Sequence, residues 1–254
     1  MNRWDFFFGK VGIVKSFRTL LGLATLLIGI TGQQAMAQST LFNIPSTDAV
    51  AKGKVYAEFD YFAQMPSGTS RLYTYVPRGV VGLGGGVEAG ANVAATRVAG
   101  ATQWYFQPDI KYRFFGNDDK GVAASAGTIL YTPMNNRTGL DTWGLAYGNL
   151  SKKAKGTYGP RITAGPYVVY SEAKSWAGPK AGAILGYEQP VSSKVTLLAD
   201  WFSGKNFYGY FTPGVSFTLP HSSLFNAGYS IGNDTFSGNT SKNRLLFLYY
   251  GITF

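Results

Sequence analysis

The residues best suited to catalysis are a serine, a histidine and scattered carboxylates. Ser230 stands in "GYSIG" (228–232), which fits the G-x-S-x-G motif of serine hydrolases. That motif needs a strand–turn–helix elbow and a histidine that follows the serine in the chain. Ser230 instead lies within an alternating segment, and the single histidine, His221, precedes it. We therefore interpret the motif as a chance match.

Two other patterns also give little indication of a catalytic or nucleotide-binding site. His221 is followed by Ser222, a pairing that lipid-hydrolysing enzymes use, but both residues fall in a predicted turn. The stretch "GGGVEA" (84–89) fits G-x-G-x-x-A, yet no helix follows that could hold a pyrophosphate. With one histidine and no cysteine, the chain offers no thiol chemistry and little for a transition metal. We expect no enzyme activity, no metal site and no cofactor.

The composition favours strands. Of 254 residues, 16% are aromatic and only 14% are charged, against a usual share of about 25%. There are also 33 glycines. Many aromatic residues and glycines, with few charges, suit short strands that are joined by tight turns.

Alternation with period two recurs along the chain and predicts the strands. In 102–115 one face is aromatic or aliphatic and the other polar, and 54–62 repeats the pattern. The predicted strands are 54–62, 71–83, 87–97, 102–115, 121–131, 141–150, 159–171, 180–189, 194–203, 206–218, 224–232 and 244–254. Twelve strands are expected, or ten, because 79–86 and 141–150 are rich in glycine. Short turns alternate with longer loops, which is typical of a transmembrane barrel of antiparallel strands.

The first residues are read as a secretory signal peptide. A basic leader precedes the apolar run "LLGLATLLIGI" (20–30), which is shorter than the ~20 residues of a spanning helix. "AMA" (35–37) then supplies small residues for cleavage. An uncleaved anchor is the alternative. We assign 1–37 to the signal peptide, 38–52 to a periplasmic N-terminal segment and 53–254 to the barrel. Because export comes first, nucleic acid is not an expected partner.

The last strand carries the most specific pattern. In "RLLFLYYGITF" (244–254) apolar residues alternate up to the final Phe254. This resembles the closing strand of Gram-negative outer-membrane β-barrel proteins, the porin-like superfamily, with no particular subfamily. In that superfamily the strand is recognised by the barrel-assembly machinery, which implies this role for Phe254, Ile252 and Tyr250. The opposite face, Leu245, Phe247 and Tyr249, is apolar too, which favours a partly filled interior.

Two all-β architectures remain open from alternation alone. A soluble sandwich or barrel buries its apolar face, whereas a membrane barrel turns that face to lipid and closes so that no backbone group is unpaired. The export signal, the aromatic faces without scattered charges and the terminal strand favour the second. We predict an all-β fold: a closed antiparallel transmembrane β-barrel of about 12 strands in the bacterial outer membrane.

The same parity directs a set of charges into the lumen. They are Glu58, Asp60, Arg78, Glu88, Asp109, Lys111, Arg113, Arg161, Glu188 and Asp200. Both signs are present, so a single-sign selective ring is not expected. Buried charges need partners. Arg78 is expected to meet Glu88 near the periplasmic mouth, and Arg113 and Arg161 to meet Glu88, Glu188 or Asp109. Segment 38–52 could fold into that mouth.

Two functions are compatible with such a lumen. The first is a narrow passive channel for small polar or zwitterionic solutes, and the alternative is a non-conducting structural or surface-interaction barrel with a salt-bridged lumen. Outer-membrane lipid and lipopolysaccharide are the expected surroundings. Basic residues in the longer loops could pair with lipopolysaccharide phosphates, or be simply solvated. They are Arg71, Arg97, Arg137, Lys174, Lys180, Lys205, Lys242 and Arg244.

Overall fold

The computed structural model describes residues 39–65, 72–98, 100–135, 141–170, 176, 178–233 and 244–254. These residues form twelve strands in one sheet. The strands are β1 (Val55–Gln64), β2 (Tyr73–Gly84), β3 (Val87–Val98), β4 (Ala101–Asn117), β5 (Val122–Pro133), β6 (Trp143–Lys153), β7 (Arg161–Tyr170), β8 (Ala181–Pro190), β9 (Val195–Phe202), β10 (Tyr210–Leu219), β11 (Ser223–Gly232) and β12 (Arg244–Thr253). The predicted count of twelve is confirmed, and most of both glycine-rich stretches lies in β2 and β6.

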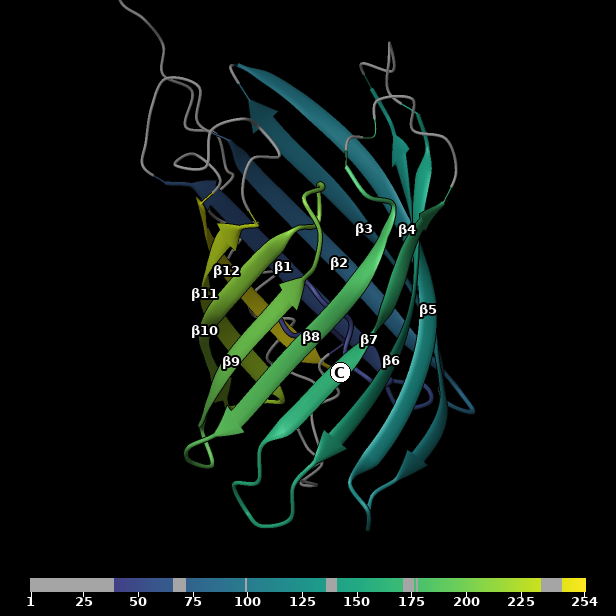
Figure 1. Ribbon diagram of the computed structural model, residues 1–254, viewed down its shortest axis with the longest axis vertical. Helices are drawn as coiled ribbons and strands as arrows, with labels where there is room; N and C mark the ends of the chain where they lie inside the picture. Colours follow the sequence, from purple (N-terminus) through teal and green to yellow (C-terminus); the bar gives the residue numbers. More distant parts are fainter. Residues whose placement is uncertain are drawn as a thin grey trace, which may run out of the picture. The chain divides into compact units, whose positions relative to one another are not determined.

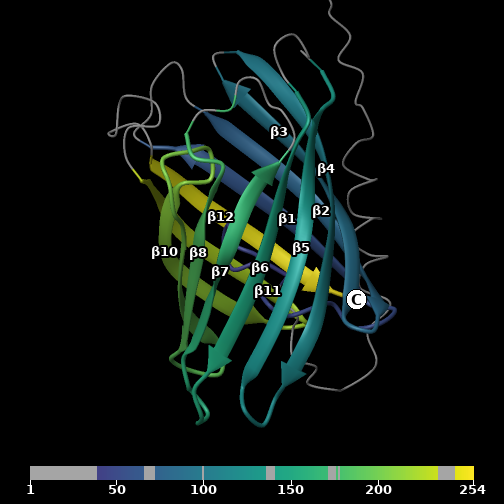
Figure 2. The same cartoon turned by 45° about the vertical axis from the view of Figure 1, so that its right-hand side comes forward.

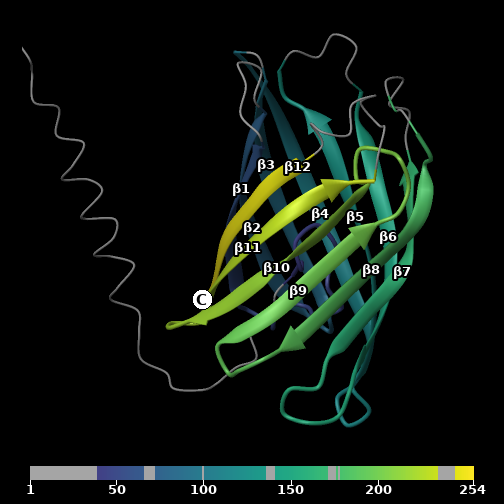
Figure 3. The same ribbon diagram turned by 60° about the vertical axis from the view of Figure 1, so that its left-hand side comes forward.

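The sheet closes on itself. Each strand pairs antiparallel with its neighbour in the chain, and β12 returns to pair with β1. At this seam Phe59 lies opposite Tyr250, and Tyr61 lies opposite Leu248. Figure 1 shows the ring of tilted strands, Figure 2 shows the face formed by β5, β6 and β7, and Figure 3 shows β9 to β12. The prediction of a closed antiparallel barrel is confirmed.

The outer surface of the barrel is apolar. Along β4 the outward side chains Phe106, Ile110 and Tyr112 are each more than 40% exposed, whereas Lys111 between them is 2% exposed. Strand β1 repeats this pattern, with Phe59 outside and Glu58 inside. Aromatic and aliphatic side chains therefore face outward and charged ones inward, which is the reverse of a water-soluble barrel.

Connections differ between the two ends of the barrel. One end, here called the turn end, carries the connections at 85–86, 118–121, 154–160, 191–194 and 220–222. The other, the loop end, carries the remaining ones, most of them longer. The β2–β3 turn uses Gly85 and Gly86 at φ of 62° and 83°, values that suit a two-residue hairpin turn. His221 and Ser222 have φ of 61° and 52° in the β10–β11 turn. Their positive φ values mark them as turn residues.

The predicted strand 206–218 begins too early. Gly209 N–H donates to the carbonyl of Asn206 at 3.0 Å, so these residues form a turn and β10 starts at Tyr210. The signal peptide 1–37 and the loop residues Arg71, Arg137, Lys174 and Lys242 lie outside the described residues. Within the described ranges there is no helix long and apolar enough to cross a membrane.

Candidate functional site

Residues 39–50, here called the inner segment, lie inside the barrel (Figures 1 and 3). Their first half is a small hairpin. Ser46 N–H donates to the Ser39 carbonyl and Leu41 N–H to the Ile44 carbonyl, both at 2.9 Å. Leu41 and Ile44 are completely buried. The inner segment therefore fills part of the lumen as a folded element.

The hairpin tip is held by one carboxylate on β9. Asp200 Oδ2 accepts backbone N–H bonds from Phe42 at 3.0 Å, Asn43 at 2.5 Å and Ile44 at 3.0 Å. The Asn43 side chain also donates to Asp200 Oδ1 at 3.2 Å and to Thr212 Oγ1 at 2.8 Å. Three converging N–H groups compensate a charge that is almost completely buried, so Asp200 anchors the inner segment to the wall.

Apolar wall residues pack on both sides of the hairpin. Phe42 contacts an apolar patch from β9, β11 and β12, with its ring 5.5 Å from that of Phe247 and 6.4 Å from that of Tyr249. Leu41 and Ile44 pack against a second patch from β6 to β9, which includes Leu145 and Ile184. The inner segment thus completes a hydrophobic core within the lumen.

Ion pairs fix the rest of the inner segment at the turn end. Lys111 Nζ lies 2.9 Å from Glu88 Oε1, and Glu88 also accepts from the Ser39 hydroxyl at 2.6 Å and Val50 N–H at 2.7 Å. On the other side, Arg161 contacts Glu188 of β8 and lies 2.6 Å from Asp48. Each of these charges has a close partner, as burial requires.

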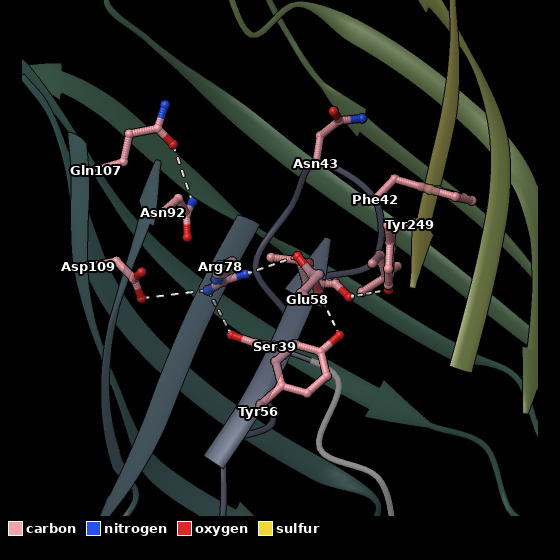
Figure 4. A network of polar contacts seen from close by, with 12 residues as sticks. Ser39, Phe42, Asn43, Tyr56, Glu58, Arg78, Asn92, Gln107, Asp109 and Tyr249 are labelled. Atoms are coloured by element: carbon pink, nitrogen blue, oxygen red, sulfur yellow. Dashed lines mark hydrogen bonds and ion pairs between the residues drawn. The ribbon is translucent and has the colours of Figure 1, made fainter. Parts of the chain in front are cut away.

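A second group of charges lies nearer the middle of the barrel, and its contacts are looser. Arg78 lies 3.7 Å from Glu58 Oε1 and 3.6 Å from Asp109 Oδ1, and it donates to the Ser39 hydroxyl at 3.1 Å (Figure 4). Tyr56 donates its hydroxyl to Glu58 Oε2 at 2.6 Å. One guanidinium therefore bridges two carboxylates and reaches the inner segment.

Strand register explains which charges pair. Glu58 lies directly opposite Arg78 on β2, Glu88 opposite Lys111 on β4, and Arg161 opposite Glu188 on β8. Directly opposed residues on one face of a sheet are the closest cross-strand neighbours. These three ion pairs of the lumen wall thus follow from pairing in the sheet.

Above the inner segment lies a chamber of about 420 Å³ that extends toward the loop end. Thr40, Phe42 and Asn43 form its floor. Its charged lining residues within the described part of the chain are Glu58, Asp60 and Arg78. Asn92 and Gln107 join this polar side, hydrogen-bonded to each other at 3.2 Å (Figure 4).

A second side of the chamber is aromatic. Trp143 stacks on Tyr131 with ring centroids 5.1 Å apart, and Tyr105 meets it edge-on at 5.3 Å. Trp143 also donates its indole N–H to the Tyr208 hydroxyl at 3.1 Å. Burial raises the pKa of Tyr208 well above its usual value, so this hydroxyl is neutral. The chamber therefore has a charged side from β1 to β3 and an aromatic side from β4 to β6 and the β9–β10 loop.

This architecture is similar to that of solved structures, although no family model matches the sequence. No curated protein is similar enough to count as a relative. Among solved structures, the COG4313 outer membrane channel from Pseudomonas putida F1 has a TM-score of 0.57 at 12% identity, covering 81% of this chain and 97% of that one. The chain has the fold of an outer-membrane β-barrel. A second similar structure is the translocator domain of autotransporter NalP from Neisseria meningitidis, with a TM-score of 0.42, 14% identity and coverages of 79% and 87%.

Within this outer-membrane barrel fold, most of the expected lumen charges lie inside the ring. Arg161 contacts Glu188, one of the partners considered for it. The expected pair of Arg78 with Glu88 is wrong, because register brings each of them a different partner. Arg113 does not reach Glu88, Glu188 or Asp109 either. It contacts Asp118 in the β4–β5 turn, beside a register shift at the end of β4.

Several residues that matter in the lumen were missed by sequence reasoning. Asp48 and Asn43 belong to the inner segment, whose place inside the barrel no local pattern revealed. A signal was present, however. Phe247 and Tyr249 are inward and apolar, and both contact Phe42. The expectation of a partly filled interior is thus confirmed, and residues 39–50 supply the filling.

The residues considered for other roles also have defined places. Ser230 lies in β11, where its hydroxyl is 2.8 Å from that of Thr212, and it is not on an elbow. Tyr250 and Phe254 are exposed on the outer surface at the barrel seam, beside Ile252. Their role in assembly stays a prediction. Among the residues that the structure describes, no cluster of three potential metal ligands is present.

Proposed function

We propose that this chain is a bacterial outer-membrane protein whose barrel is a narrow passive channel for small polar solutes. A solute enters the chamber at the loop end and continues when the inner segment moves aside at the turn end. The observation that carries the proposal is a chamber of about 420 Å³, lined by charged and amide side chains, inside a barrel with an apolar exterior.

The polar side of the chamber supports passage of hydrated solutes. Glu58, Asp60, Arg78 and Asn92 offer both donors and acceptors that replace part of a solute's hydration shell. A purely structural interior would be packed throughout, as the turn-end half is. The chamber instead leaves polar side chains facing free volume.

The apolar exterior supports lipid as the surrounding medium. In the outer membrane the turn end would face the periplasm and the loop end the outside, the usual arrangement for short turns and longer loops. Arg97, Lys180, Lys205 and Arg244 are exposed at the loop end, where lipopolysaccharide phosphates are potential partners. The barrel-assembly machinery remains the proposed partner of the terminal strand.

A non-conducting barrel is the second candidate, and one observation favours it. The inner segment is buried and bonded to several strands, so it fills part of the lumen. The two candidates differ in whether this segment can move while the barrel stays folded.

A reversible cross-link tests that difference. The hydroxyl oxygens of Thr47 and Ser151 are 2.6 Å apart, which makes this pair suitable for a disulfide between the inner segment and β6. The chain has no cysteine of its own, so Thr47→Cys/Ser151→Cys introduces a single possible bond. Protein purified in detergent is inserted into planar bilayers, and its conductance is recorded before and after reduction.

We expect discrete conductance steps from the wild type, silence from the oxidised double variant, and recovery on reduction. Thr47→Cys and Ser151→Cys alone serve as controls and should conduct like the wild type. If neither the wild type nor the reduced double variant ever conducts, the channel proposal is wrong and the non-conducting barrel replaces it. If the oxidised variant conducts normally, solutes pass without movement of the inner segment.

A further inference from the structure

We infer that the chamber holds a binding site for an organic ammonium cation with an apolar or aromatic body, and that Asp60 is its charged contact. The inference deepens the proposed function and rests on it in one respect, namely that solutes reach the chamber. It comes from the balance of charges around the chamber and from the arrangement of its two sides.

Carboxyl groups outnumber cations around the chamber. Glu58, Asp60 and Asp109 supply three carboxylates, and Arg78 supplies one guanidinium. The other buried charges are compensated elsewhere: Glu88 pairs with Lys111, Arg161 pairs with Glu188 and Asp48, and Asp200 accepts three backbone N–H bonds. A buried excess of carboxylates is costly unless a cation compensates it.

Asp60 is the chamber carboxyl group that forms no ion pair of its own within the described residues. Its side chain lines the chamber and the residue is only 9% exposed, yet Oδ1 accepts no hydrogen bond within the described structure. Arg78, the cation nearest in the network, is shared between Glu58 and Asp109. Glu58 lies two residues from Asp60 on the same face of β1, so both carboxylates would gain from a positive charge between them.

A second acceptor points to the same ligand. Asn92 donates through Nδ2 to Gln107, and its Oδ1 is buried without a hydrogen-bond donor. An ammonium group carries three N–H donors and no acceptor. It can therefore satisfy Asp60 and still offer donors to other oxygens of the polar side.

The aromatic side of the chamber is suited to bind the apolar body of the ligand. Trp143, Tyr131 and Tyr105 form one ring cluster on β4 to β6 that lines the chamber. Such a surface excludes water from an apolar body, and its ring faces attract cations. A simple inorganic cation would use the carboxylates alone, whereas an amine with a hydrocarbon body uses both sides of the chamber.

A matched series of solutes tests this inference. Protein purified in a non-ionic detergent is titrated by calorimetry at low salt with 2-phenylethylamine, L-phenylalanine and 3-phenylpropionate. The three share a phenyl ring and differ in charge, from cation through zwitterion to anion. We expect the amine to bind about tenfold or more tightly than the anion, with the zwitterion between them.

Asp60→Asn should remove about tenfold of the amine's affinity and leave the anion's affinity unchanged or improved. Asp119→Asn, in an exposed turn, is the matched control and should bind like the wild type. Equal binding of all three solutes by the wild type would overturn the inference, and that comparison needs no variant to fold. A charge preference that survives Asp60→Asn would also overturn it.

Swelling of proteoliposomes in the same solutes separates this inference from the proposed function. Amine binding without any permeation supports the cation site and overturns the channel. Permeation without any preference in binding supports the channel and overturns the cation site.

Discussion

The two halves of the lumen hold their charges in different ways. At the turn end, Lys111 lies 2.9 Å from Glu88 and Arg161 lies 2.6 Å from Asp48. Around the chamber, the contacts of Arg78 lengthen to 3.6 and 3.7 Å, and Asp60 keeps an unsatisfied oxygen. The turn-end charges are compensated as in a protein core, and the chamber charges are compensated only in part.

One barrel therefore combines two kinds of interior. The turn-end half gains its stability from burial, since Leu41 and Ile44 are completely removed from solvent. The chamber lacks this stabilisation by burial, because free volume remains beside its charged groups. We therefore expect the free volume to accommodate a solute. Substitutions in the turn-end half should therefore affect folding and closure, and those around the chamber should affect binding.

The largest effect is expected from Asp200→Ala. The variant leaves three N–H groups without their acceptor, and the loss costs roughly 1–3 kcal/mol for each of the two that are buried. The inner segment should respond by leaving the wall. In a Thr47→Cys background, where residue 47 is completely buried in the wild type, labelling by a water-soluble maleimide should accelerate about tenfold or more.

The control for this experiment is Asp119→Asn in the same background, which should label as slowly as Thr47→Cys alone. Barrel integrity is followed by the heat-dependent gel mobility of each variant. If Asp200→Ala leaves labelling slow in a folded barrel, the carboxylate is not the anchor of the inner segment. Apolar packing alone would then hold the inner segment against the wall.

Glu88→Gln should have the next largest effect. It leaves the Lys111 ammonium, 2% exposed, without a carboxylate, and an unpaired buried charge costs about 3–5 kcal/mol. We expect a lower guanidinium midpoint for unfolding of the barrel in lipid vesicles. Glu88→Gln/Lys111→Met removes both charges and should recover most of the loss. A double variant no more stable than the single one would show that the pair is not compensated as in a core.

Strand parity accounts for what the sequence could predict. Because side chains alternate across a strand, Glu58 and Lys111 are placed inside as soon as Phe59 and Tyr112 are placed outside. Partner choice needs one more quantity, the register. Arg78 and Glu88 flank the same turn, yet register brings Asn92 opposite Arg78 and Lys111 opposite Glu88.

Local sequence patterns do not predict the position of the inner segment. Phe42 and Asp200 are 158 residues apart in the chain, and their hydrogen bond exists only once nine strands have been placed. A short apolar stretch such as 41–44 has no period that would assign it to the inside of a barrel. Only the inward apolar residues Phe247 and Tyr249 indicated that something fills the lumen.

The smallest effect is expected from Arg113→Ala. From the sequence, Arg113 and Arg161 are equivalent lumen charges, but Arg113 contacts Asp118, whose side chain is 96% exposed. A pair so open to water contributes about 0–1 kcal/mol. The unfolding midpoint and the conductance should therefore stay close to those of the wild type, whereas Arg161→Ala, which strands Asp48 and Glu188, should lower the midpoint clearly. Conductance that changes as strongly in Arg113→Ala as in Arg161→Ala would place a solute-contacting charge at the turn-end mouth, and the division into a sealed half and an open half would have to be redrawn.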